Sequence, residues 1–256
     1  MLGLNETGGY ARDVRFRKTS FLFMLAAAAL FLVSFTLQLL ASLQRWVTFS
    51  ATRGPTDISV EDHVYDYFIP GEDWEPIGTA AQLLGAGLLV QVLGLLAMAL
   101  GIMLLPATTR VFSRLGTVGI AGLEAVLVLL VAATFTAHGG YLLASGANGT
   151  IPGMQIGPGV FWTMFWASLL GLGALALLWG NRLRAAGTAC SLLIGSTMLG
   201  YLLATYMVAP MIFGGSHDTA RFTETVVAAS TAAAAVAMAF GARDVVRRTA
   251  RSIEPA

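Results

Sequence analysis

The stretch "IGTAAQLLGAGLLVQVLGLLAMALGIMLL" (Ile77–Leu105) decides the fold of this chain. It runs for 29 residues without a charged side chain, whereas a helix needs about 20 apolar residues to cross the hydrocarbon core of a bilayer. Backbone N–H and C=O groups find no water in lipid, and the stretch lacks the alternation of a barrel strand. It is therefore predicted to form a transmembrane helix.

Small residues recur in this stretch at every seventh position. Such a period keeps one face of a helix against one neighbour, and the missing side chains let the two backbones approach closely. We expect a packing seam here, either within the chain or, as the alternative, against a partner subunit. The seam residues are Ala80, Gly87, Gly94 and Gly101.

The rest of the chain repeats the pattern of long apolar runs. Hydrophobic residues make up 56% of the sequence and charged residues only 11%, against about 25% charged residues in soluble domains. The fold class is therefore predicted to be all-α, a polytopic membrane protein with a bundle of six transmembrane helices. Pro210 is expected to kink or end the fifth of them. The other five runs lie at 20–42, 116–145, 159–180, 185–213 and 222–240.

Basic residues set the expected orientation of the six-helix domain 20–240. Twelve of the fifteen fall on one side of the spans, including those of the N-terminal segment 1–19 and the tail 241–256. The positive-inside rule then places both termini in the cytoplasm, in a plasma membrane. Lys18 is the sole lysine, and this bias towards arginine, alanine and glycine is typical of GC-rich bacteria. The three exceptions are Arg45, Arg53 and Arg221.

The one long loop on the predicted outer side, 43–76, is acidic. Apolar residues at helical spacing predict a short amphipathic helix on the outer surface over Val60–Phe68, beginning with a capping box at Ser59 and ending before Pro70. One interpretation is a docking surface for a cationic partner, and the other is a solvated acidic loop. The candidate docking residues are Glu61, Asp62, Asp66, Tyr67, Phe68 and Trp74.

Glu124 is the acidic residue placed deep inside an apolar run. A charged carboxylate at such a depth costs about 2.5 kcal/mol or more. Protonation, hydrogen bonds from polar groups at the same depth or a wet cavity would lower that cost. No basic residue is expected at this depth, so an ion pair within the chain is not predicted. The other intramembrane polar candidates are Gln91, Ser191, Ser196 and Thr197.

Histidines and acids on the predicted outer side form a second candidate site. Imidazole and carboxylate groups are ligands of zinc and copper. However, none of the histidine spacings typical of metal sites occurs, and the single cysteine, Cys190, excludes a cysteine cluster. We therefore predict no metal and no other cofactor. The residues of this outer candidate cluster are His63, His138, His217, Asp218 and Glu224.

These patterns favour a non-catalytic membrane subunit or accessory protein of a larger envelope or respiratory complex, with the lipid bilayer and other membrane-protein subunits as its partners. The alternative is a small permease or channel component with Glu124 in a proton or cation path. A second alternative is a membrane enzyme that uses a metal on the outer histidines. A formal net charge of +1 gives no reason to expect a nucleic acid partner.

Overall fold

The computed structural model describes residues 4–53, 57–105, 114–151, 158–214 and 218–251. These residues are 85% helical and contain no strand. Among them, five helices are long and apolar enough to span a membrane, and the number rises to six if one bent helix pair counts as a single span. The predicted all-α class with several membrane-spanning helices is confirmed, with five to six candidate spans against the six expected.

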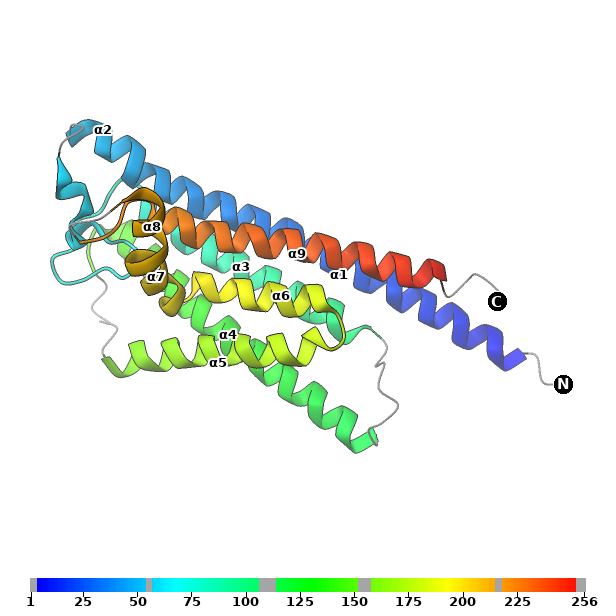
Figure 1. Cartoon of the computed structure of the whole chain (residues 1–256). Helices are drawn as coiled ribbons and strands as arrows, with labels where there is room; N and C mark the ends of the chain where they lie inside the picture. Colours follow the sequence, from blue (N-terminus) through cyan, green and yellow to red (C-terminus); the bar gives the residue numbers. More distant parts are fainter. Residues whose placement is uncertain (1–3, 54–56, 106–113, 152–157, 215–217, 252–256) are drawn as a thin grey trace.

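The spans form a closed ring in which each packs against two neighbours. Helix α1 contacts α3 and α9, α4 contacts α3 and α5, and α6 contacts α5 and α9. Figure 1 shows these helices side by side along one common direction. The continuous spans are α1 (Leu4–Leu43), α3 (Ala80–Met103), α4 (Arg114–Asn148), α5 (Pro158–Gly180) and α9 (Thr223–Arg251).

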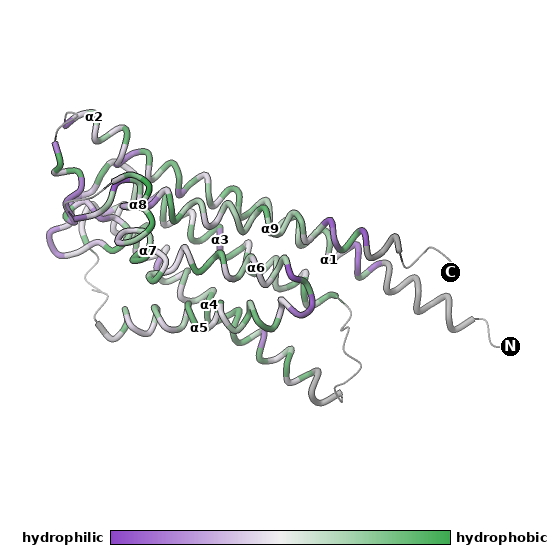
Figure 2. The backbone as a smooth tube through the Cα atoms, in the orientation of Figure 1, coloured by the Kyte–Doolittle hydropathy of each residue, from purple (hydrophilic) through white to green (hydrophobic). Residues whose placement is uncertain are grey.

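The bundle has two different ends. Helix α1 begins and α9 ends at one of them, which we call the terminal end (Figure 1). At the opposite end, the cap end, α1 continues through a π turn, η1 (Gln44–Phe49), into the short α2 (Ser50–Arg53), and the loop 57–79 follows. Hydrophilic segments gather at the two ends, with mostly apolar helix between them (Figure 2).

The predicted small-residue seam packs against α1. The Ser34 hydroxyl donates to the Gly87 carbonyl at 2.7 Å, and the Ser20 hydroxyl donates to the Gly101 carbonyl at the same distance. A Cβ atom at Gly94 would lie 2.6 Å from the ring of Phe31. The seam is thus confirmed as a contact within the chain.

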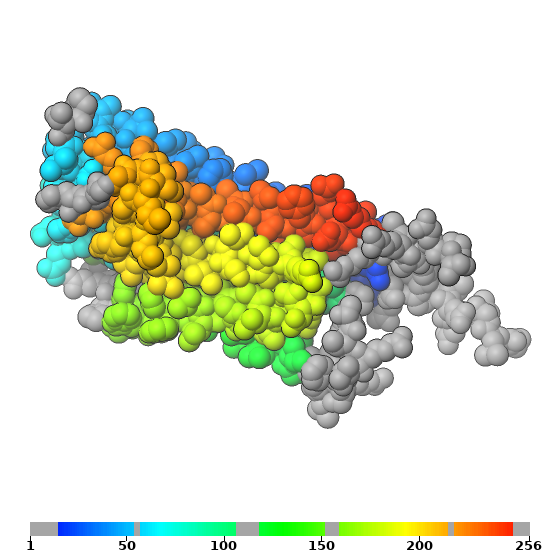
Figure 3. Space-filling model, in the orientation of Figure 1, coloured from blue at the N-terminus to red at the C-terminus, as the bar shows by residue number. Residues whose placement is uncertain are grey.

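The run predicted at 185–213 is broken rather than continuous. Its two halves, Arg184–Ser196 and Met198–Phe213, meet at an angle of 67°. The break falls at Thr197, whose extended backbone caps α7, and not at Pro210, which lies in α8. The second half forms part of the surface at the cap end, drawn in gold in Figure 3. The pieces are α6 (Arg184–Leu193), η4 (Ile194–Ser196), α7 (Met198–Leu203), η5 (Ala204–Val208) and α8 (Ala209–Phe213).

The amphipathic helix predicted at Val60–Phe68 does not form. Two separate 3₁₀ turns take its place, η2 (Ile58–Glu61) and η3 (His63–Tyr65), with Asp62 extended between them. In a continuous α-helix, the Val60 and Asp62 carbonyls would accept from amides four residues further along the chain. Instead, both accept hydrogen bonds from the side chain of Arg45.

Candidate functional site

Arg45 lies at the cap end with its side chain 0% exposed. The π turn η1 carries it into the bundle, where its Nε and Nη2 atoms donate to the Val60 carbonyl at 3.1 and 3.0 Å. Nη2 also donates to the Asp62 carbonyl at 3.1 Å. Nη1 donates to the carboxylates of Asp66 and Glu224, the latter at 3.0 Å. These bonds use all five N–H groups of the guanidinium.

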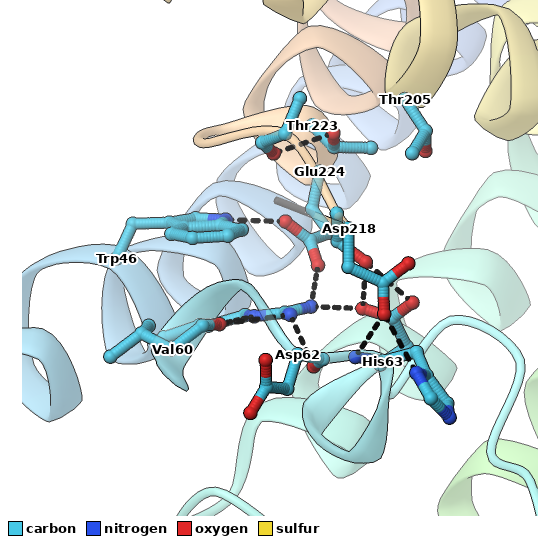
Figure 4. A network of polar contacts seen from close by, with 12 residues as sticks. Trp46, Val60, Asp62, His63, Thr205, Asp218, Thr223 and Glu224 are labelled. Carbon is cyan, nitrogen blue, oxygen red and sulfur yellow. Dashed lines mark hydrogen bonds and ion pairs between the residues drawn. The ribbon is translucent and has the colours of Figure 1, made fainter. Parts of the chain in front are cut away.

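The two carboxylates around Arg45 have further partners of their own. The indole Nε1 of Trp46 donates to the second oxygen of Glu224, as Figure 4 shows. The Thr219 hydroxyl lies 2.9 and 2.8 Å from the two oxygens of Asp66. With both acids ionised, this buried group carries one more negative than positive charge, because a single guanidinium faces two carboxylates.

Two more ion pairs join the cap loop to the start of α9. Arg221 Nε contacts Glu61 at 2.9 Å. The Asp218 carboxylate accepts from the backbone N–H of His63 at 2.9 Å and lies 2.7 Å from its Nδ1 (Figure 4). The hydrogen bond and the negative charge of Asp218 raise the pKa of His63 above its ordinary value. We call the seven residues involved the cap cluster. They are Arg45, Glu61, His63, Asp66, Asp218, Arg221 and Glu224.

The outer candidate cluster is only partly brought together. His63 and Asp218 pair on the surface, whereas Glu224 turns to the buried guanidinium. His138 is buried elsewhere, in α4, and His217 lies outside the described residues. Across the described part of the chain, no group of three or more His, Cys, Asp or Glu side chains could hold a metal ion.

The loop residues predicted to dock a partner are largely buried within the chain. The ring of Phe68 stacks on that of Tyr201 in α7, with centroids 4.3 Å apart and an interplanar angle of 3°. Burial removes four of the six candidates from any docking surface, so the prediction is wrong for them. Asp66 contacts Arg45, and Asp62 is partly exposed. The four buried residues are Glu61, Tyr67, Phe68 and Trp74.

Glu124 forms an ion pair within the chain, contrary to prediction. Its Oε2 atom accepts a hydrogen bond from Arg182 Nη1 at 3.1 Å, and its Oε1 atom lies 2.9 Å from Arg182 Nη2 as an ion-pair contact. The Glu124 side chain is 0% exposed and that of Arg182 is 23% exposed. Arg182 follows the last turn of α5 and reaches back into the bundle, because a long arginine side chain can lie along apolar surface.

Amide and hydroxyl groups in the middle of the bundle also bond to each other. Gln91 Nε2 donates to the Ser196 hydroxyl at 2.7 Å. The Gln91 carbonyl oxygen accepts from Gln38 Nε2 at 3.1 Å and from the Thr231 hydroxyl at 3.2 Å. This amide network joins α1, α3, α9 and the break at η4. Sequence reasoning identified Gln91 and Ser196 but overlooked Gln38, although it is an amide inside the first apolar run.

The remaining intramembrane candidates make local bonds. The Ser191 hydroxyl donates to the Gly187 carbonyl at 3.1 Å, one turn earlier. The Thr197 hydroxyl donates to the Ile194 carbonyl at 2.7 Å. These hydroxyls therefore bond to carbonyl groups of their own segment, and Glu124 pairs with Arg182 instead.

Sequence reasoning counted Arg45 only as one of three basic residues on the outer side. The available signal was its position next to Trp46, directly after an apolar run and before an acidic loop. An arginine at such a boundary needs carboxylate or carbonyl partners, and the loop supplies both.

Taken together, the apolar spans, the paired interior charges and the polar ends define a membrane-embedded helical protein. No protein-family model, curated protein or solved structure matches this chain.

Proposed function

We propose that this chain is a non-catalytic subunit of a larger bacterial membrane complex, docked laterally to its partners in the plasma membrane. The ion pair between Glu124 and Arg182 carries the proposal. A carboxylate already paired with a guanidinium, through one charge-assisted hydrogen bond and a second close N···O contact, does not need a transported cation to balance its charge. A structural role for this buried ion pair follows more directly than a role in conduction.

One face of α5 supports docking through the bilayer. Trp162, Trp166, Leu170 and Leu177 follow one side of the helix and are each at least half exposed. Gly173 lies between them, and a Cβ atom there would meet nothing within 4 Å. Exposed tryptophans suit protein interfaces, and a small residue between large ones lets another helix approach. We call these five residues the α5 stripe.

The proposed orientation has both termini in the cytoplasm. The excess of arginine near the terminal end supports it through the positive-inside rule. The cap end would then face outwards. There, Glu72, Asp73 and Glu75 stay exposed after the rest of the loop has folded onto the bundle, and they are available to a basic surface of a partner.

The broken helix supports a second candidate function, a small permease or channel component. Discontinuous spans place substrate sites at the break in many transporters, and here the break lies beside the Gln91–Ser196 hydrogen bond. In this second reading the path would follow the amide network rather than Glu124.

Purification of the full chain from its native membrane in mild detergent tests the proposal. We expect a partner in fixed stoichiometry, and a photoreactive residue at Leu170 should crosslink to it, whereas one at Leu25, exposed on α1, should not. Gly173→Leu should abolish the complex without unfolding the chain, because the site is open. A lone chain that crosslinks only to lipid would contradict docking. Proton or sodium flux through that lone chain in liposomes would favour the permease.

A further inference from the structure

A small cavity lies where α4, α5 and the break of the sixth span meet, with a volume of about 10 Å³. Its polar lining consists of Thr134, His138, Ser168 and Thr197, and a phenylalanine and two methionines complete it. Three of these four polar residues are buried, and Thr134 is partly buried. The cavity has about the smallest volume that accommodates one water molecule, which is on the order of 10–15 Å³.

His138 lines this cavity, and its imidazole has one nitrogen left as a hydrogen-bond acceptor. Its Nε2 lies 2.8 Å from the carbonyl oxygen of Phe68. Because a carbonyl oxygen only accepts, Nε2 must carry the hydrogen. In the neutral ring, Nδ1 then carries a lone pair and can only accept a hydrogen bond.

The three lining residues with hydroxyl groups have also used their hydrogens. Thr134 donates its hydrogen to the Val131 carbonyl at 2.7 Å, and Ser168 donates to the Met164 carbonyl at 2.8 Å. Thr197 donates to the carbonyl of Ile194, as described above. Each hydroxyl has one hydrogen, so only lone pairs remain.

We propose that this cavity binds one small neutral hydrogen-bond donor, water in the resting protein, with Nδ1 of His138 as its main acceptor. A lining of lone pairs needs a ligand that donates, and the volume admits a single water-sized molecule. A cation would also donate or coordinate, but burying a charge without a carboxylate costs several kcal/mol. None of the seven lining residues is acidic.

The bound donor would link the cap loop to the broken helix. His138 holds the backbone of Phe68 in the loop, and its ring meets the Phe68 ring edge-on, with centroids 4.9 Å apart. Thr197, at the break itself, is another of the residues that line the cavity. Loss of the ligand would therefore loosen the contact between α4, α5 and the break. The site is independent of the proposed docking through the α5 stripe.

Solid-state NMR on the full chain in bilayers, with ¹⁵N-labelled histidine, tests the proposal. The His138 signals are assigned by their loss in His138→Gln. We expect the Nε2–H tautomer, an Nδ1 that accepts a hydrogen bond, and magnetisation transfer from a bound water to the ring. Ser168→Val fills the cavity and should abolish that transfer, and the isosteric Thr134→Val should weaken it.

Thr163→Val is the matched control, because Thr163 is exposed on α5 and bonds only to its own helix. It should leave the transfer unchanged. An Nδ1–H tautomer, or a ring that receives no transfer from water, would overturn the proposal. So would an imidazolium at neutral pH, since that would make this a site for a proton.

Discussion

At the scale of single residues, Arg45 does more than any other side chain to hold the cap end together. Its guanidinium bridges the cap loop and α9, and every one of its N–H groups has an acceptor. Removing one partner of a buried ion pair leaves the other charge buried and unpaired. Loss of the Arg45 guanidinium would leave two neighbouring carboxylates, Asp66 and Glu224, without a positive charge between them.

Arg45→Met is therefore expected to lower the free energy of unfolding by about 3–5 kcal/mol. Arg53→Met is the control, because Arg53 is exposed and forms one hydrogen bond, to the Tyr65 hydroxyl. It should cost about 1 kcal/mol. Unfolding in mixed micelles measures both variants. Adding Glu224→Gln to Arg45→Met should recover part of the loss, and equal losses in the two single variants would contradict this account.

Pairing between buried charges is the part of the site that the sequence predicted worst. Glu124 was correctly singled out as a residue in need of a partner, because that need depends on its chemistry alone. Its partner Arg182 was missed because depth was counted along each run, as if side chains stayed at the level of their own Cα atoms. Glu124 meets Arg182 because an arginine side chain is long and because α4 packs on α5. Neither property can be predicted from the spacing of residues in the sequence.

At the scale of secondary structure elements, sequence patterns predicted the packing seam of α3 but not the break at Thr197. The seam of α3 follows from a repeat of small residues, which is a property of one helix. The break depends on contacts between two halves of a span that is apolar throughout. Its local signal is the pair Gly195 and Gly200, since a Cβ atom at Gly200 would lie 2.3 Å from the Gly195 carbonyl oxygen.

Gly200→Ala should consequently destabilise the protein, by about 1–3 kcal/mol for an overpacked contact. The clash is with backbone, so no side-chain rotation relieves it. Gly173→Ala is the matched control, where a Cβ atom meets nothing, and it should be neutral or stabilising by up to about 1 kcal/mol. Thermal unfolding of both variants in the same detergent makes the comparison. A Gly200→Ala variant as stable as the control would mean that the two halves do not approach so closely.

At the scale of the whole molecule, composition and charge already predict the class of fold. Burial of apolar helices in lipid depends on their length and composition, so the all-α class is confirmed, with five to six candidate spans. Composition and charge did not predict the conformation of the loop 57–79. That conformation depends on Arg45, a residue outside the loop, which donates hydrogen bonds to two of the loop's carbonyl groups. Orientation rests on a separate physical cause, the distribution of arginines, and needs its own measurement.

Labelling of single cysteines in intact cells tests that orientation. Cys190 is buried and is first replaced in Cys190→Ala. Glu72→Cys, at an exposed site of the cap end, should then react with a membrane-impermeant maleimide from outside. Arg243→Cys, exposed near the terminal end, should react only after permeabilisation, because the positive-inside rule retains arginine-rich segments in the cytoplasm. Leu170→Cys should stay unlabelled, since the polar reagent does not enter lipid. The reverse labelling pattern at Glu72→Cys and Arg243→Cys would contradict the proposed orientation, and the cap cluster would then lie on the cytoplasmic side.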